Sequence, residues 1–320
     1  MFLPPLLLLM AMSPTTTHHE FRFVPYGSTF SCQDDWPTIS CDGRIPGGVT
    51  LELTHWTDNK TPDNLYADTS TEMALRFARQ QQTLEDALIL NNHYDTDGVL
   101  SVWACLEPSL ALEYQGLLKE GAEAGDFGEW SSDNGVKLDC AIESFQKTDE
   151  EQAYYDILQE LPSLLNDMEQ TGGESYRDLW NHGFQQALQD WDALKDGSLK
   201  RGPGKMVLLV EPGRHLSPYA VHRGLVHAGL WKGTTRILRC LESADGSFHY
   251  RYEMPGHGWV KKLVDRSVIP SADKSQIVKE LPHGWTSSDG LVGICHTTVA
   301  TKTLPEEVAF LLHQIDGGCQ

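Results

Sequence analysis

The chain has 320 residues, of which 40% are hydrophobic, and its formal net charge at pH 7 is −20. That length is enough for one large domain or two ordinary ones. Because nucleic acids are bound through clustered Lys and Arg, the excess of 45 Asp and Glu over 25 Lys and Arg argues against a nucleic-acid duplex as partner. A small anionic substrate remains compatible with this charge, since a metal ion and a few arginines can meet it locally.

Residues 1–18 read as a tail. The apolar run over residues 3–12 is too short to span a membrane and lacks the positively charged start of a signal peptide. The seven cysteines are widely spaced and form no Cys-x-x-Cys pair, which favours a reducing compartment. We therefore expect a cytoplasmic protein with no membrane segment. Secretion is the second interpretation, because Ala11 and Ser13 are compatible with a cleavage site.

Residues 36–56 predict a strand, a glycine-marked turn and a second strand. Residues 49–54 alternate apolar and polar side chains with period two, and they lead directly into His55. A polar loop follows and ends at a helix, for which Asp68 or Ser70 is the expected N-cap.

Residues 87–90 predict a short buried strand, after which His93, Asp95 and Asp97 occupy alternate positions before Gly98. Alternate side chains of an extended segment point to one side, so we expect the three donors to converge, with a turn at Gly98. One imidazole and two carboxylates suit a divalent cation. The alternative is an Asp-rich surface turn that merely ends the strand.

Residues 99–104 and 111–124 predict two further helices, the second ending at residues 125–128. Strands alternating with helices are typical of a mostly parallel sheet covered by flanking helices on both faces. Ligands of such sheets gather at the carboxyl ends of the strands. We expect His55 and the segment from His93 to Asp97 to lie there.

The remainder predicts two amphipathic helices over residues 148–195, a linker over residues 196–204 and several strands beyond it. We therefore expect an α/β domain over residues 19–200 and a smaller α+β domain over residues 205–320.

Arg214, His215 and His222 follow the first strand of the second domain. Two imidazoles and a guanidinium at this position are expected to line a cleft and grip an anionic substrate group. The alternative is an ordinary loop and helix with surface charges.

The segment from Asp95 to Ser101, Asp-Thr-Asp-Gly-Val-Leu-Ser, resembles motif I of the DHH phosphoesterase superfamily. Members of that superfamily carry an Asp-x-Asp at the end of a parallel strand and hold two manganese ions. The resemblance implies that Asp95 and Asp97 are metal ligands and that Asp126, in Gly-Asp-Phe-Gly, takes the place of the motif II aspartate. The Asp-His-His triplet is absent, and the nearest sequence to a Gly-Gly-Gly-His is residues 255–258. The pattern is also similar to an uncharacterised family of DHH-like proteins.

These observations predict a metal-dependent hydrolase that acts on a small phosphoester or phosphoanhydride in a cleft between two domains. The expected cation is Mn²⁺, with Fe²⁺ or Mg²⁺ as alternatives. The expected ligands are His93, Asp95, Asp97, Asp126, His55 and Asp68.

Three other functions remain open. One is a haloacid-dehalogenase-like phosphatase with Asp95 as nucleophile. The others are a metal-dependent enzyme for a non-phosphate substrate and a non-catalytic binding protein. The sequence does not fix the oligomeric state.

Overall fold

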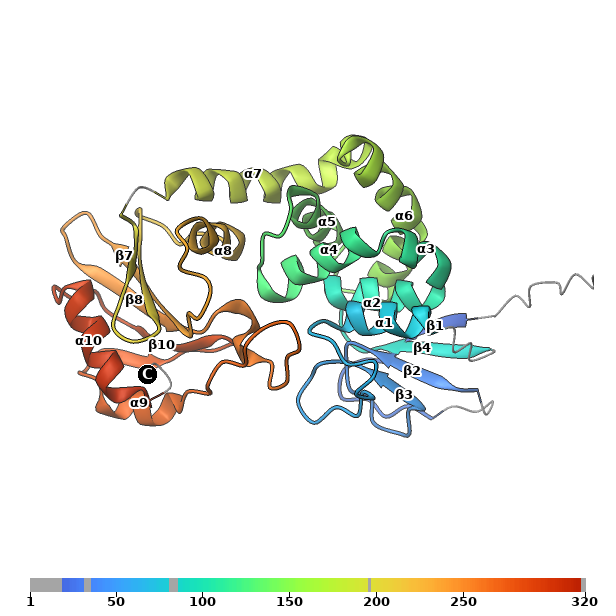
Figure 1. Ribbon diagram of the computed structural model, residues 1–320, viewed down its shortest axis with the longest axis horizontal. Helices are drawn as coiled ribbons and strands as arrows, with labels where there is room; N and C mark the ends of the chain where they lie inside the picture. Colours follow the sequence, from blue (N-terminus) through green and yellow to red (C-terminus); the bar gives the residue numbers. More distant parts are fainter. Residues whose placement is uncertain (1–18, 32–35, 81–85, 195–196, 318–320) are drawn as a thin grey trace, which may run out of the picture.

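In the part of the chain that the structure describes, the polypeptide forms two β-sheets, one in each half, and they lie side by side in Figure 1. The computed structural model describes residues 19–31, 36–80, 86–194 and 197–317. The tail expected over residues 1–18 lies outside these ranges.

The first sheet is parallel throughout. Its strand order is β1 (His19–Phe23), β4 (Ala87–Asn91), β2 (Thr38–Cys41) and β3 (Leu51–Leu53). The predicted strand at residues 87–90 is therefore confirmed as β4. The predicted strand, turn and strand become β2 and β3, which pair in parallel although only residues 42–50 connect them.

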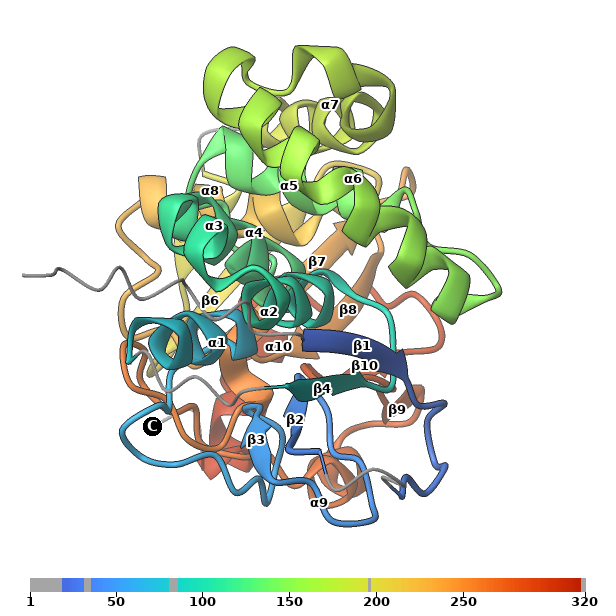
Figure 2. The same cartoon turned by 90° about the vertical axis from the view of Figure 1, so that its right-hand side faces the viewer.

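The two faces of the first sheet are covered differently. Ala87 and Ile89 of β4 pack with the helices, while Leu88 and Leu90, which alternate with them, pack against Val24, Phe30 and Ile45 from loops. Figure 2 shows α1 and α2 on the same side of this sheet. The expectation of helices on both faces was therefore wrong, because loop hydrophobics close the second face.

The first two helices begin at residues that differ slightly from those predicted. Helix α1 (Ser70–Arg79) is capped by Thr69, whose side chain accepts from the Glu72 amide, not by Asp68 or Ser70. Helix α2 (Thr96–Leu106) is capped by Asp95, so Asp97 and Gly98 lie in its first turn. The predicted extended segment followed by a turn at Gly98 was therefore wrong. A Cβ at Gly98 would lie 2.7 Å from the Tyr154 hydroxyl, which explains the glycine by close packing.

The predicted helix over residues 111–124 is two helices, α3 (Pro108–Glu113) and α4 (Gln115–Phe127). Asp126 belongs to the last turn of α4 and not to the turn beyond it. The helix ends at Gly128, which has a φ of 61° in the left-handed region.

Four further helical segments complete this half, and α7 leads across to the second sheet (Figure 1). They are α5 (Asp133–Glu143), α6 (Glu150–Thr171), η1 (Glu174–Tyr176) and α7 (Arg177–Ala193).

The second sheet is mixed, with β6 and β7 parallel and its other neighbouring strands antiparallel. Its strand order is β5 (Leu199–Arg201), β6 (Met206–Glu211), β7 (Arg236–Glu242), β8 (Phe248–Glu253), β10 (Gly293–Thr297) and β9 (Trp285–Ser287). The predicted linker over residues 196–204 contains the edge strand β5.

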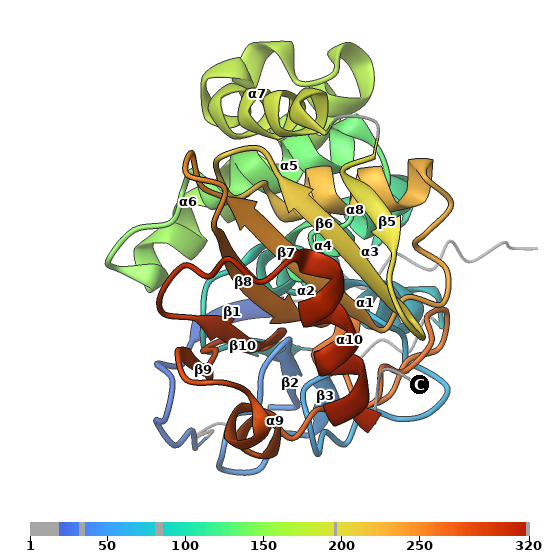
Figure 3. The ribbon, with the colours of Figure 1, turned by 90° about the vertical axis from the view of Figure 1, so that its left-hand side faces the viewer.

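Helices cover both faces of the second sheet. Met206 and Leu208 of β6 pack with residues of α9 (Lys274–Glu280) and α10 (Pro305–Ile315), whereas Val207 and Leu209 pack with α8 (Pro218–His227). Figure 3 shows α10 in front of the sheet and α8 behind it. The short η2 (Gly256–Trp259) follows β8.

The fold is thus an α/β fold with a parallel first sheet and a mixed α+β second part, which confirms the predicted class. The boundaries at residues 200 and 205 stay a prediction. Within the described ranges, no helix is both long enough and apolar enough to cross a bilayer.

Candidate metal centre

Three adjacent strands of the first sheet end at the candidate site. In the order β4, β2 and β3, each strand is followed by a residue with a metal-binding side chain. Asp42 follows β2 directly, His55 follows β3, and His93 follows β4. Because the strands are parallel, their carboxyl ends meet at one edge, and Asp42 comes to lie between the two histidines.

Asp42 has one carboxylate oxygen near each histidine. Its Oδ1 lies 3.4 Å from Nε2 of His55, and its Oδ2 lies 3.1 Å from Nε2 of His93. The residue is 1% exposed and has a φ of 44°, in a region that Asp tolerates better than most residues. Such backbone strain is typical of functional sites.

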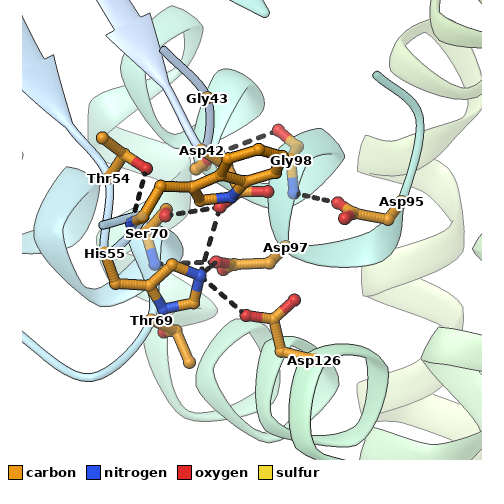
Figure 4. Close-up of polar contacts among 12 residues, drawn as sticks. Asp42, Gly43, Thr54, His55, Thr69, Ser70, Asp95, Asp97, Gly98 and Asp126 are labelled. Atoms are coloured by element: carbon orange, nitrogen blue, oxygen red, sulfur yellow. Dashed lines mark hydrogen bonds and ion pairs between the residues drawn. The ribbon is translucent and has the colours of Figure 1, made fainter. Parts of the chain in front are cut away.

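The first group of donors surrounds His55, which is buried. Its Nδ1 donates to the main-chain oxygen of Asp68 at 2.6 Å, since a carbonyl can only accept. Its Nε2 lies 3.0 Å from Oδ2 of Asp126 and 3.9 Å from Oδ2 of Asp97. In Figure 4 the side chains of Asp42, His55, Asp97 and Asp126 point toward one another.

The second group surrounds His93. Its Nδ1 lies 2.9 Å from Oδ1 of Asn92, an amide whose orientation is fixed because its Nδ2 donates to the Arg44 carbonyl. Its Nε2 lies 3.0 Å from Oδ2 of Asp95. Asp95 is the most open member of the site, with 37% of its side chain exposed.

Both imidazoles therefore face acceptors at both ring nitrogens. A neutral imidazole has one N–H, and in both rings Nδ1 uses it. Each Nε2 then points a lone pair at carboxylates, an arrangement that requires either a proton on the ring or a cation between the groups. A histidine whose outer nitrogen is held by a carbonyl is also the usual arrangement of a metal ligand.

Unsatisfied polar atoms support a cation at this place. Asp42 Oδ2, His55 Nε2 and Asp126 Oδ2 are buried and have no hydrogen bond of good geometry. Buried polar atoms without partners are rare, because each costs about 1–3 kcal/mol. Two sets of side chains have ligand atoms close enough for one ion each, Asp42–His93–Asp95 and Asp42–His55–Asp97. The residues present thus fit two divalent cations that share Asp42.

The pKa values reflect the crowded charges. Burial raises the pKa of Asp97 well above its usual value, and the charges of Asp126 and Asp42 raise it further. Burial also raises the pKa of Asp126 to about 6, against the opposing charge of His55. Burial lowers the pKa of His93, but Asp95 and Asp42 outweigh it and bring that pKa to about 11. The carboxylates therefore repel one another, and positive charge at the site stabilises them.

Asp97 is held by the start of α1. Its Oδ2 accepts from the Ser70 amide at 2.7 Å and its Oδ1 accepts from the Thr71 amide at 2.8 Å. The first amides of a helix have no partner inside the helix and attract negative charge. A carboxylate oxygen has two lone pairs, so these bonds leave Asp97 able to bind a cation.

The side chain of Asp68, unlike those of the other predicted ligands, is bonded to residues of the second half of the chain. Its carboxylate accepts from the amides of Val264, Asp265 and Arg266 and from the guanidinium of Arg266. These donors come from the second half of the chain. Asp68 acts on the site through its main-chain oxygen, which orients His55.

The three predicted residues of the second domain are not brought to this cluster. Arg214 pairs with Asp190, and Nδ1 of His215 lies 2.7 Å from Oε2 of Glu211. His222 accepts from the Trp130 amide at 2.9 Å. Each of the three therefore has a structural contact elsewhere among the described residues.

Sequence reasoning found five of the clustered side chains, His55, His93, Asp95, Asp97 and Asp126, and missed Asp42. The Asp42–Gly43 pair was interpreted as part of a turn. A usable signal existed, since Asp42 directly follows a short buried strand, and carboxylates at the ends of parallel strands are candidate ligands.

The fold and site together define a two-part α/β protein with a buried Asp/His cluster at the edge of a parallel sheet. Residues 19–284 match the model described as "Family of unknown function (DUF6687)", and the chain belongs to that family. No curated protein matches it. Among solved structures, the chain is similar to PggH, a pGpG-specific phosphodiesterase from Vibrio cholerae. The two share 11% identity with a TM-score of 0.41, over 87% of this chain and 85% of that one.

Proposed function

We propose that this chain is a metal-dependent hydrolase whose Asp/His cluster would hold two divalent cations, with Asp42 as a ligand common to both sets. One cation would bind His93, Asp95 and Asp42, and the other would bind His55, Asp97 and Asp42, with Asp126 next to it. The observation that carries the proposal is the placement of the Asp42 oxygens, one 3.4 Å from His55 Nε2 and one 3.1 Å from His93 Nε2.

The donor set favours particular cations. Carboxylates mixed with imidazoles suit Mn²⁺ or Fe²⁺ better than Ca²⁺, and Mg²⁺ is a further candidate. When bound, a pair of such cations supplies a hydroxide nucleophile and polarises the bond to be broken. This chemistry suits a small phosphoester or phosphoanhydride, whose negative charge the cations would meet inside an otherwise acidic protein.

The chain's own residues orient and enclose the site. The Asp68 carbonyl and the Asn92 amide hold both imidazoles with Nε2 facing inward. The start of α1 fixes Asp97. Burial of Asp42, His55 and Asp97 excludes water on one side, whereas His93 and Asp95 are 21% and 37% exposed. The substrate would therefore approach from the side of His93 and Asp95.

Metal content and turnover of matched variants test the proposal. Purified protein would be analysed by elemental mass spectrometry, then reconstituted separately with Mn²⁺, Fe²⁺ and Mg²⁺ and assayed on a panel of phosphoesters and phosphoanhydrides. The test variant is Asp42→Asn. The control is Asp139→Asn, which changes a carboxylate that is 1% exposed and hydrogen-bonded to Thr96 and Tyr219, outside both ligand sets.

The expected result is near-stoichiometric binding of two cations and metal-dependent hydrolysis in the wild type and Asp139→Asn, with both lost in folded Asp42→Asn. Cations bound at full occupancy without hydrolysis of any phosphate substrate would identify a structural or binding centre. No cation bound under any condition would overturn the proposal.

A further inference from the structure

A cavity of about 390 Å³ lies beside the Asp/His cluster. Both halves of the chain line it, and most of its wall is aromatic or apolar. Its lining includes Tyr26, Arg44, Trp56 and Thr57 from the first half and Trp259 and Leu291 from the second. The volume falls within the range of about 300–1,000 Å³ that is typical of small-molecule sites.

Two indoles connect this cavity to the metal centre. The Trp56 ring lies 5.2 Å from the His93 ring, and the Trp259 ring lies 4.9 Å from the His55 ring, measured between centroids. Each half of the chain thus contributes one tryptophan, and each tryptophan contacts a different histidine of the centre. A molecule in the cavity would therefore contact the two indoles that pack against the histidines of the centre.

Two large apolar side chains of the cavity lining are exposed to solvent. Tyr26 is 73% exposed and Leu291 is 64% exposed, the two highest values among large hydrophobic residues in the described ranges. Single exposed hydrophobics need no explanation, but two beside half-buried tryptophans form a patch that a ligand would cover. A purely inorganic anion, such as pyrophosphate, would leave this patch unused.

Arg44 is the charged residue of the lining. Across the described ranges it forms no ion pair, and its guanidinium donates only to the Thr57 carbonyl, at 3.4 Å. Its carbonyl accepts from Asn92, the side chain that orients His93. A guanidinium without a carboxylate partner, in so acidic a chain and beside the centre, is suited to an anionic oxygen of the substrate.

We propose that this cavity selects substrates that carry a planar aromatic ring next to the anionic ester, with the ring bound between Trp56 and Trp259 and the anion against Arg44. This inference rests on the proposed function, because it assigns the substrate class of the same centre. Aromatic rings prefer offset or edge-to-face contacts with other rings, which saturated rings of the same size do not make.

A matched pair of ligands isolates the aromatic contribution. Benzylphosphonic acid and cyclohexylmethylphosphonic acid have the same length and charge, and neither is hydrolysed at the phosphorus–carbon bond. Their dissociation constants for metal-loaded protein would be measured by calorimetry. The corresponding phosphate esters would be assayed for kcat/KM. We expect the benzyl compounds to be favoured about tenfold in both measurements.

Three variants and one control locate the effect. Trp56→Leu and Trp259→Leu should each bring the benzyl preference close to one, with metal content measured alongside. Arg44→Gln should weaken both phosphonates alike, by about tenfold or more. The control is Trp285→Leu, which changes a half-buried tryptophan of β9 that stacks on Tyr250 in the second sheet. It should leave the preference unchanged.

The outcomes separate this inference from the proposed function. Ring-selective binding that both tryptophan variants abolish supports the inference even if no ester is hydrolysed, in which case the hydrolase proposal fails. Equal binding of the two phosphonates, or a preference that survives in both tryptophan variants, overturns the inference, whether or not hydrolysis occurs.

Discussion

Among the described residues, the cluster around Glu211 and the cluster around Asp42 each combine a buried carboxylate with histidine, and the two differ in how completely their buried polar atoms are bonded. Around Glu211 in the second sheet, Oε1 accepts from the Leu216 amide and from Arg239, and Oε2 lies 2.7 Å from His215 Nδ1. Arg239 also pairs with Glu253. Around Asp42, three buried ligand atoms have no hydrogen bond of good geometry.

This contrast separates structural polar groups from candidate functional ones. The Glu211 cluster is complete within the chain, so it stabilises the sheet and requires nothing further. The Asp42 cluster brings four carboxylates, Asp42, Asp95, Asp97 and Asp126, around two imidazoles. Both clusters contain carboxylates and histidine, so these residue types alone do not distinguish them. The number of buried polar atoms without a hydrogen bond does.

The largest expected effect is that of Asp42→Asn. Because Asp42 is shared by both ligand sets, the change should abolish binding of both cations and lower hydrolysis by at least about 10³-fold. A cation at a thousandfold excess over its Kd stabilises a folded protein by about 4 kcal/mol. Adding Mn²⁺ should therefore raise the Tm of the wild type in calorimetry and leave that of the variant unchanged. An equal rise in both would contradict the bridging role of Asp42.

Glu211→Gln tests the structural role of the Glu211 cluster. Removing one partner of a buried ion pair leaves Arg239 incompletely paired and should cost about 3–5 kcal/mol in the free energy of unfolding. Metal content and turnover of the folded fraction should match the wild type. Urea denaturation followed by circular dichroism measures the first effect, and elemental analysis the second. Loss of metal at unchanged stability would remove the distinction between the clusters.

Asp139→Asn tests how the stability of the protein depends on pH at a buried carboxyl group outside both clusters. Burial raises the pKa of Asp139 to about 6, against hydrogen bonds from Thr96 and Tyr219 that lower it. The folded state therefore favours the protonated acid, and its stabilisation is complete below about pH 4 and lost as the pH rises through 6. The shift corresponds to about 3 kcal/mol.

The asparagine variant has no proton to lose at this position. Relative to the wild type it should gain stability between about pH 4 and 6 and keep that gain at neutral pH. Unfolding free energies measured across this range check the sign. A stability difference that does not change with pH would show that folding does not raise the pKa of Asp139.

The smallest expected effect is that of Thr69→Ala. The change removes the side-chain cap of α1 and should cost about 1 kcal/mol of stability. The amides of Ser70 and Thr71 still hold Asp97, so metal affinity should stay within about twofold. A large loss of affinity, measured by titration with Mn²⁺, would show that the cap positions Asp97.

Local sequence patterns predicted some features of this molecule for clear physical reasons. The apolar run at residues 87–90 forms β4, and the donors that follow it in sequence, His93 and Asp95, meet at the site. The α/β class follows from the alternation of strands and helices. These features depend on residues close together in the chain.

Other features depend on contacts that local patterns do not encode. The position of Asp42 between His55 and His93 follows from the strand order β4, β2, β3, which only the folded sheet establishes. The same holds for β1, an edge strand that pairs with β4 across a long sequence separation. The sequence also could not predict that Arg214 pairs with Asp190 and His215 with Glu211. Charged residues after a strand have the same local pattern whether they bind a substrate or form ion pairs within the protein.

Asp68 connects the contact between the two halves of the chain to the candidate cation centre. Its carboxylate receives the amides of residues 264–266 from the second half, while its carbonyl fixes the ring of His55 in the first. Docking of the second half and loading of the cation near His55 are therefore expected to be reciprocal. If docking of the second half raises the cation affinity by some factor, the bound cation must raise the equilibrium constant for docking by the same factor. The group around His93 has no such connection through Asp68, so docking of the second half should change cation affinity more at the His55 position than at the His93 position.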